Sequence, residues 1–150
     1  MKQKFDNDKA KHCLNVARKC YEIAKEKYGQ DEDFARKMWL IGYCHDIGYE
    51  FTDKENPHDH ALIANQMIVS AFNVSCSAIL NHGKRIPQNS LELKILNEAD
   101  LLVDRKGNIS SVESRLSDIA MRYSFESPEY TNAHWLAKEL ELISTEIEEE

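Results

Sequence analysis

The sequence predicts an all-α protein, a compact bundle of about six to seven helices. In several segments, apolar residues recur at three- and four-residue spacing, the period of a helix with one buried face. The chain has only 5 Gly and 3 Pro, few for a protein built from hairpins and turns. No segment shows the alternation of apolar and polar residues that a half-buried strand requires. Since the chain has 150 residues, we expect residues 1–150 to form a single domain.

The expected helices are bounded by glycine or by polar segments. The first has an apolar stripe and stops at Gly29, and the second ends near Gly48. Asp59 and Ser90 are candidate N-caps of the third and fifth helices, because short polar side chains satisfy the free N–H groups of a first turn. The expected helices cover residues 8–28, 31–45, 59–71, 76–81, 91–107, 110–123 and 129–148.

Histidine and aspartate side chains mark the inner faces or the ends of five of these helical segments. Each is of a type that binds transition metals through nitrogen or carboxylate oxygen. Taken singly, a helical histidine beside an apolar stripe is more often a hydrogen-bonded core residue than a ligand. Their coincidence in one chain favours a metal site. The candidate ligands are His12, His45, Asp46, His60, His82 and Asp100.

The adjacent pair His45-Asp46 is the strongest of these signals. Neighbouring residues lie about 100° apart on a helix, so both side chains can reach one site if the helix end points at it. The alternative is a histidine favoured by the helix dipole, followed by a turn aspartate. Of His58 and His60, we prefer His60 as a ligand because Ala64, four residues on, is small and permits close helix packing.

This order of residues resembles the HD superfamily of metal-dependent phosphohydrolases, named for its His-Asp pair. The resemblance covers roughly residues 8–106 and implies a helical fold with its ligands in one cleft. It implies His12, His45, Asp46 and Asp100 as core ligands. His60 and His82 resemble the two additional ligands of branches that hold two metals.

Residues 82–100 are similar to the matching stretch of bacterial symmetrical diadenosine tetraphosphate hydrolases. In that branch a lysine usually stands three places after the HD aspartate, where this chain has Tyr49. The loop from Asp46 to His60 is also shorter than in that branch. The resemblance therefore implies a phosphoesterase more directly than it implies a dinucleotide substrate.

Four imidazoles and two carboxylates suit Fe, Mn, Co, Ni or Zn better than Mg, which prefers oxygen ligands and retained water. We expect two ions about 3.5–4 Å apart, bridged by Asp46 and by a water that attacks phosphorus. Lys84 and Arg85 follow His82 and are candidates to neutralise phosphate oxygens, with solvated surface cations as the alternative. The catalytic candidates are thus Asp46, Lys84 and Arg85. Asp104, one turn beyond Asp100, is a candidate for a supporting role.

The expected partner is a phosphorylated small molecule, above all a nucleotide. A net charge of −7 argues against general nucleic-acid binding. No apolar run reaches the roughly 18 residues of a membrane span. The chain has four cysteines without C-x-x-C spacing and begins with no signal peptide, so we expect a cytoplasmic protein. The last expected helix has no assigned role, so it could form the interface of a homodimer.

Two other functions remain open at the level of sequence. One is a regulatory module that binds metal or nucleotide without turnover. The other is a di-iron oxygenase on the same scaffold, because iron held by histidine and aspartate can activate oxygen. Oxygen consumption without phosphate release would distinguish the oxygenase from a phosphohydrolase.

Overall fold

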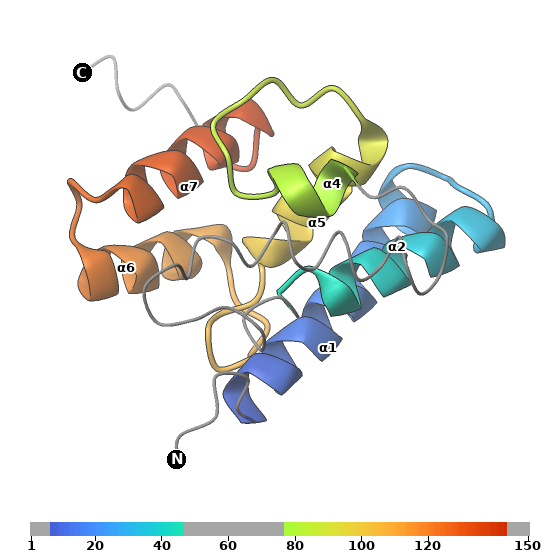
Figure 1. Ribbon diagram of the computed structural model, residues 1–150, viewed down its shortest axis with the longest axis horizontal. Helices are drawn as coiled ribbons and strands as arrows, with labels where there is room; N and C mark the ends of the chain where they lie inside the picture. The colour runs from blue at the N-terminus through green and yellow to red at the C-terminus, as the bar shows by residue number, and fades with distance from the viewer. Residues whose placement is uncertain (1–6, 47–76, 144–150) are drawn as a thin grey trace.

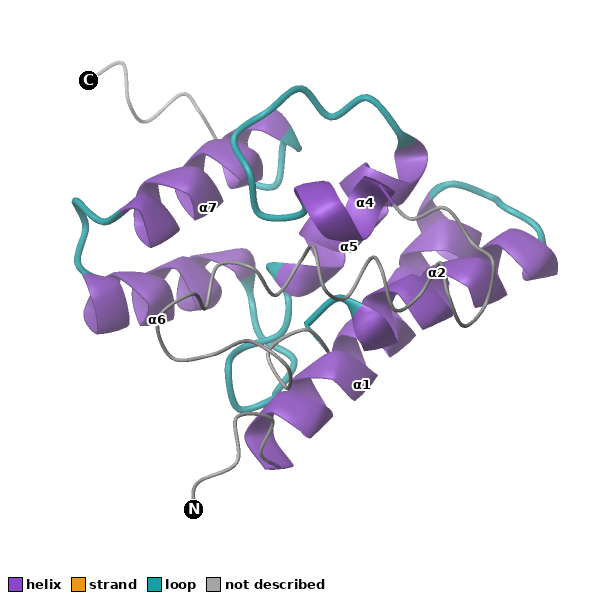
Figure 2. Cartoon of the chain, viewed as in Figure 1, coloured by secondary structure: helices purple, strands orange, loops and turns teal. Residues whose placement is uncertain are grey.

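The computed structural model describes residues 7–46 and 77–143, and their regular structure is helical (Figure 2). The prediction of an all-α fold is confirmed. An isolated antiparallel bridge between Val103 and Ile109 is the one β feature of these ranges. The expected helix at residues 59–71 lies outside the described residues. The helices are α1 (Asn7–Glu22), continued by the π-helical turn η1 (Ile23–Lys27), α2 (Glu32–Cys44), α4 (Ser77–Asn81), α5 (Leu91–Asp100), α6 (Val112–Tyr123) and α7 (Pro128–Glu139).

Four of the helices begin at an aspartate or serine N-cap. In each, the side-chain oxygen accepts a hydrogen bond from the backbone N–H three residues further on, which satisfies one free donor of the first turn. Ser90 is the cap that the sequence predicts for α5. The caps are Asp31, Ser90, Ser111 and Ser127.

Helix α5 is shorter than the sequence predicts. It ends at Asp100, whereas the expected helix continues to Gly107. Val103 continues the apolar spacing of the helix and is fully buried. It lies in an extended segment, however, and not in a helix. The side chain of Asp104 accepts hydrogen bonds from the backbone N–H groups of Lys106 and Asn108, and such local bonds compete with helix formation.

Helix α7 is also shorter than expected. It ends at Glu139, and Leu140 forms its C-cap, whereas the expected helix runs to residue 148. The N–H of Leu142 donates to the carbonyl of Ala137 beyond the last helical turn. Residues 144–150 lie outside the described residues.

Helices α1 and α2 approach each other closely at Gly42. A Cβ at this position would lie 2.9 Å from Ala17 Cα and 2.9 Å from Cys20 Sγ. Only glycine leaves room for this approach, so the sequence of α2 determines how near its end comes to the inner face of α1.

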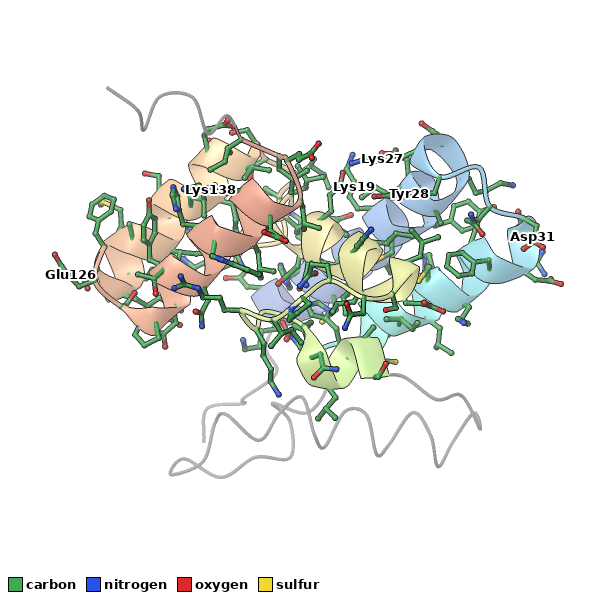
Figure 3. The ribbon with its side chains drawn as sticks, turned by 90° about the horizontal axis from the view of Figure 1, so that it is seen from above. Lys19, Lys27, Tyr28, Asp31, Glu126 and Lys138 are labelled. Carbon is green, nitrogen blue, oxygen red and sulfur yellow. The ribbon has the colours of Figure 1, made fainter. Side chains whose placement is uncertain are left out.

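Two clusters of buried apolar residues form the core. The larger one joins α1, η1, α2, α4 and α5, and α5 packs against each of the other three α-helices. The smaller one lies between α6 and α7, which run side by side at the left of Figure 1. Figure 3 shows Asp31, at the start of α2, and Glu126, between α6 and α7, at opposite ends of the described structure. No helix among the described residues is long and apolar enough to cross a membrane.

Candidate metal centre

Five of the predicted ligands come together where α1, α2, α4 and α5 meet. His12 lies on the buried face of α1, His45 and Asp46 directly follow α2, His82 directly follows α4, and Asp100 is the last residue of α5. His45 is 0% exposed and His12 is 5% exposed. Three of the four segments contribute their C-terminal ends, so the fold aims these helix ends at one point. His60 lies outside the described residues.

The ring nitrogens and carboxylate oxygens face one another at short distances. His12 Nε2 lies 2.9 Å from Asp100 Oδ1 and 3.7 Å from Asp46 Oδ2. His45 Nε2 lies 3.2 Å from Asp46 Oδ2 and 3.3 Å from Asp100 Oδ1. His82 Nε2 lies 3.5 Å from Asp46 Oδ1. The cluster therefore has three imidazole nitrogens arranged around two carboxylates.

These separations fit a divalent transition metal. An ion with bonds of about 2.0–2.2 Å holds adjacent N and O ligands roughly 2.9–3.5 Å apart when the angle between them is about 90–109°. Four of the five distances fall in this range, and the fifth exceeds it by a few tenths of an ångström. One group of three residues, His12, His45 and Asp46, offers ligand atoms that all lie within 4.8 Å of one another.

Each of the three histidines has its other ring nitrogen against a backbone carbonyl. The Nδ1 atoms of His12, His45 and His82 lie 2.9, 2.6 and 2.5 Å from the carbonyl oxygens of Asp104, Gly42 and Ile79. A carbonyl can only accept, so each Nδ1 carries the proton and donates it. This fixes the ring orientation and directs Nε2 inward, as is usual for metal-binding histidines.

Within the described residues, His45 Nε2 is a buried polar atom without a hydrogen-bond partner. The carboxylates of Asp46 and Asp100 are near it, but not in hydrogen-bond geometry. A buried polar atom without a partner is costly in free energy. A metal ion would satisfy it.

The electrostatics of the cluster favour ionised carboxylates. Burial raises the pKa of Asp46, but the neighbouring His45 and His82 outweigh burial and hold this pKa well below its usual range. Burial likewise raises the pKa of Asp100, but His12 and His45 outweigh burial and hold this pKa well below its usual range. Burial lowers the pKa of His45, while the two carboxylates raise it well above its usual value. The site therefore presents anionic oxygen ligands.

The two predicted cationic residues lie at the surface. Lys84 and Arg85 are exposed on the segment that follows α4. The guanidinium carbon of Arg85 lies 5.8 Å from the ring centroid of Trp135 on α7. His134, which precedes Trp135 in the sequence, stacks on Tyr130.

Sequence reasoning did not find the three carbonyls that orient the histidines, nor the contact between Arg85 and Trp135. A backbone carbonyl has no sequence signature, because every residue carries one. Trp135 is distant along the chain from every candidate ligand. Only the fold brings α7 to the segment after α4.

The family model described as HD domain matches residues 10–103 of the chain. No curated protein and no solved structure matches the sequence of this chain. The matched region is well over half of the chain and includes the five clustered ligand candidates. The ligand types, their order and their convergence agree with the predicted resemblance. The chain therefore belongs to the HD domain family, whose members are generally hydrolases that bind divalent metals.

Proposed function

We propose that this protein is a metal-dependent phosphohydrolase that cleaves a phosphoester or phosphoanhydride bond of a nucleotide or dinucleotide. The observation that carries the proposal is the convergence of three imidazole Nε2 atoms on the carboxylates of Asp46 and Asp100. A structural role does not explain it, because apolar residues of similar volume would stabilise this position without the cost of burying charges.

His12, His45, Asp46 and Asp100 would hold one ion, and His82 with His60 would complete the shell of a second. Bound metal in such a site supplies an activated water and polarises phosphate oxygens. The donor set of imidazole and carboxylate suits Fe, Mn, Co, Ni or Zn, with Mg as a weaker fit.

The two oxygens of Asp46 face different partners, which supports a bridging role. Oδ2 lies 3.2 Å from His45 Nε2 and 3.7 Å from His12 Nε2. Oδ1 lies 3.5 Å from His82 Nε2 on the other side. The two oxygens of this carboxylate thus face different imidazoles, as those of a carboxylate between two neighbouring ions would. Asp46 would place its negative charge between these imidazoles.

The described residues near the site provide no activated protein nucleophile. Burial raises the pKa of the Cys13 thiol, next to His12, to about 12. A thiol with this pKa stays protonated near neutral pH, and the thiolate is the reactive form. Water is therefore the nucleophile in the proposed reaction.

Lys84 and Arg85 are the proposed contacts to the phosphate groups. Both are exposed and directly follow His82. The guanidinium carbon of Arg85 lies 5.8 Å from the centroid of the Trp135 ring, and the planar set of N–H donors of an arginine suits phosphate oxygens. The resemblance to diadenosine tetraphosphate hydrolases makes dinucleoside polyphosphates the first substrates to test.

The test is turnover by protein purified without chelators, assayed with added Mn²⁺, Fe²⁺, Co²⁺ or Mg²⁺. The substrates are diadenosine tetraphosphate, nucleoside mono- and triphosphates, and an aryl phosphodiester. Asp46→Asn should lower kcat by about 10²-fold or more, because it removes one of the anionic oxygens. Asp33→Asn, at an exposed position of α2, is the matched control and should retain activity.

Three results would contradict the proposal in different ways. Stoichiometric metal without turnover of any substrate would support a regulatory module. Oxygen consumption without phosphate release would support an oxygenase. Full activity in Asp46→Asn would place the chemistry elsewhere.

A further inference from the structure

Residues 104–108, which follow α5, form a closed turn (the 104–108 turn). The N–H of Asp104 donates to the carbonyl of Asn108, and the N–H of Gly107 donates to the carbonyl of Asp104, both at 2.9 Å. Asp104 Oδ1 accepts from the N–H groups of Lys106 and Asn108, also at 2.9 Å. One side chain, Asp104, therefore organises the whole turn.

The turn is attached to α1 by contacts from three of its residues. His12 Nδ1 donates to the carbonyl of Asp104 at 2.9 Å, and Asn15 Nδ2 donates to the carbonyl of Gly107 at 2.5 Å. Lys11 Nζ donates to Asn108 Oδ1 at 3.1 Å. These donors lie one turn of helix apart or less, so α1 holds the turn along a single face.

Gly107 is required at its position for two separate reasons. Its φ is +88°, a conformation that favours glycine. A Cβ there would lie 2.5 Å from Lys11 Cγ and 2.7 Å from the backbone carbon of Lys11. The turn therefore adopts this shape and this closeness to α1 only with glycine.

The same turn is connected to two ligand candidates. It begins four residues after Asp100, and its first carbonyl holds the ring of His12. The pair His12 Nε2 and Asp100 Oδ1 is also the closest in the cluster, at 2.9 Å. The HD domain match ends at residue 103, so the turn lies immediately beyond the matched region.

We propose that the 104–108 turn is a positioning element for His12. It fixes the Nδ1 proton and the ring orientation of His12, and thereby sets the metal affinity of the site. This inference rests on the proposed metal centre. Asp104 and Asn15 are positioning residues, because each acts on the metal through His12 and neither side chain is among the nitrogen and oxygen atoms that face one another in the cluster. Loss of such supporting contacts typically costs 10–100-fold in metal affinity.

Three variants test the inference. Asp104→Ala removes the acceptor that closes the turn, while Asp104→Asn keeps a side-chain oxygen acceptor. Asn15→Ala removes the contact from the α1 side, at a helical position where alanine is favourable. The control is Ser127→Ala, which removes the N-cap of α7 and destabilises the protein away from the site.

The measurement is Co²⁺ affinity by calorimetry and by the visible absorption of the bound ion, beside the free energy of unfolding. We expect the dissociation constant to rise at least tenfold in Asp104→Ala and Asn15→Ala. It should stay within about threefold of wild type in Asp104→Asn. It should not change in Ser127→Ala, although this variant loses stability.

Unchanged Co²⁺ affinity in a folded Asp104→Ala or Asn15→Ala would overturn the inference. If Asp104→Ala does not fold, Asn15→Ala decides it. The Nδ1–H resonance of His12, recorded in metal-free protein by ¹H–¹⁵N NMR, separates this inference from the proposed function. Wild-type protein that binds no metal would refute the metal centre, and a missing or rapidly exchanging Nδ1–H signal would refute the positioning role.

Discussion

Replacing Gly42 by alanine tests the packing that joins the core to the candidate metal centre. Gly42 lies in α2 against α1, where an added Cβ would be 2.9 Å from Ala17 Cα, 2.9 Å from Cys20 Sγ and 3.1 Å from Ala17 N. Two of these atoms belong to the backbone of α1 and cannot rotate away. The helices must therefore separate to accept the methyl group.

The magnitude follows from two opposing effects. Carbon atoms pack best about 3.5–4.0 Å apart, so the contact with Ala17 Cα is too short by roughly 0.6–1.1 Å. Overpacking of this kind costs about 1–3 kcal/mol. Alanine is favoured over glycine inside a helix by about 1 kcal/mol. We expect a net loss of roughly 1 kcal/mol in the free energy of unfolding, with an upper limit of about 2 kcal/mol.

The same change should also weaken metal binding. The carbonyl of Gly42 accepts the Nδ1–H of His45 at 2.6 Å, and His12 lies on α1, on the other side of the packed interface. Separation of α1 from α2 moves the two histidines apart. The dissociation constant for Co²⁺ should therefore rise together with the loss of stability.

The assay is urea unfolding of metal-free protein, in which the midpoint should fall while the m-value stays constant. Cys20→Ala in the Gly42→Ala background removes the contact with Sγ and keeps the contact with Ala17, so it should recover part of the loss. A Gly42→Ala protein that is about 1 kcal/mol more stable than wild type would show helix propensity acting alone. That result would refute the close approach of the two helices.

Three further predictions concern the metal, a buried thiol and the arginine of the proposed site. Metal at 100 times its dissociation constant should stabilise the protein by about 2.7 kcal/mol, which corresponds to a rise of roughly 5–11 °C in Tm. His45→Ala should abolish this rise in Tm. If the rise persists in the variant, the metal binds elsewhere. Burial raises the pKa of the Cys20 thiol from 9.0 to about 12. Between these pH values the unfolded chain releases a proton that the folded chain keeps. The free energy of unfolding should therefore be unaffected by this thiol below pH 9 and should fall as the pH rises above 9. The Cys20 thiol should contribute up to about 1.4 kcal/mol per pH unit to the slope of stability against pH, so the slope should be smaller by that amount in Cys20→Ala. Equal slopes in urea titrations of the two proteins would contradict the assignment. Arg85→Lys should raise KM more than it lowers kcat, because lysine does not bind phosphate bidentately. An unchanged KM for the phosphorylated substrate would exclude this contact.

The all-α fold and most helix starts could be predicted because their causes are local. Ser90 caps α5 through a bond to a residue three positions on, and the apolar spacing of each helix is visible in any short window of sequence. The end of α5 could not be predicted in this way. Val103 continues the apolar spacing of α5, but it forms an antiparallel bridge with Ile109 and no further helical turn.

The candidate ligands could be predicted in type and order, and their geometry could not. Metal ligands must be histidine, aspartate or a few other residues, so the choice is restricted at the level of sequence. The distance of 2.9 Å between His12 and Asp100 joins residues 88 positions apart. It depends on how α1 and α5 pack, which no short window of sequence contains.

The sequence by itself determined the helical class of this protein and the residue types of its candidate metal centre, because helix periodicity and ligand chemistry are properties of the residues themselves. The tertiary structure alone decided which carbonyls orient the histidines, which oxygen of Asp46 faces which imidazole, and that Arg85 lies against Trp135. Those features depend on contacts between segments distant in sequence. Packing at positions such as Gly42 and Gly107 brings these segments together.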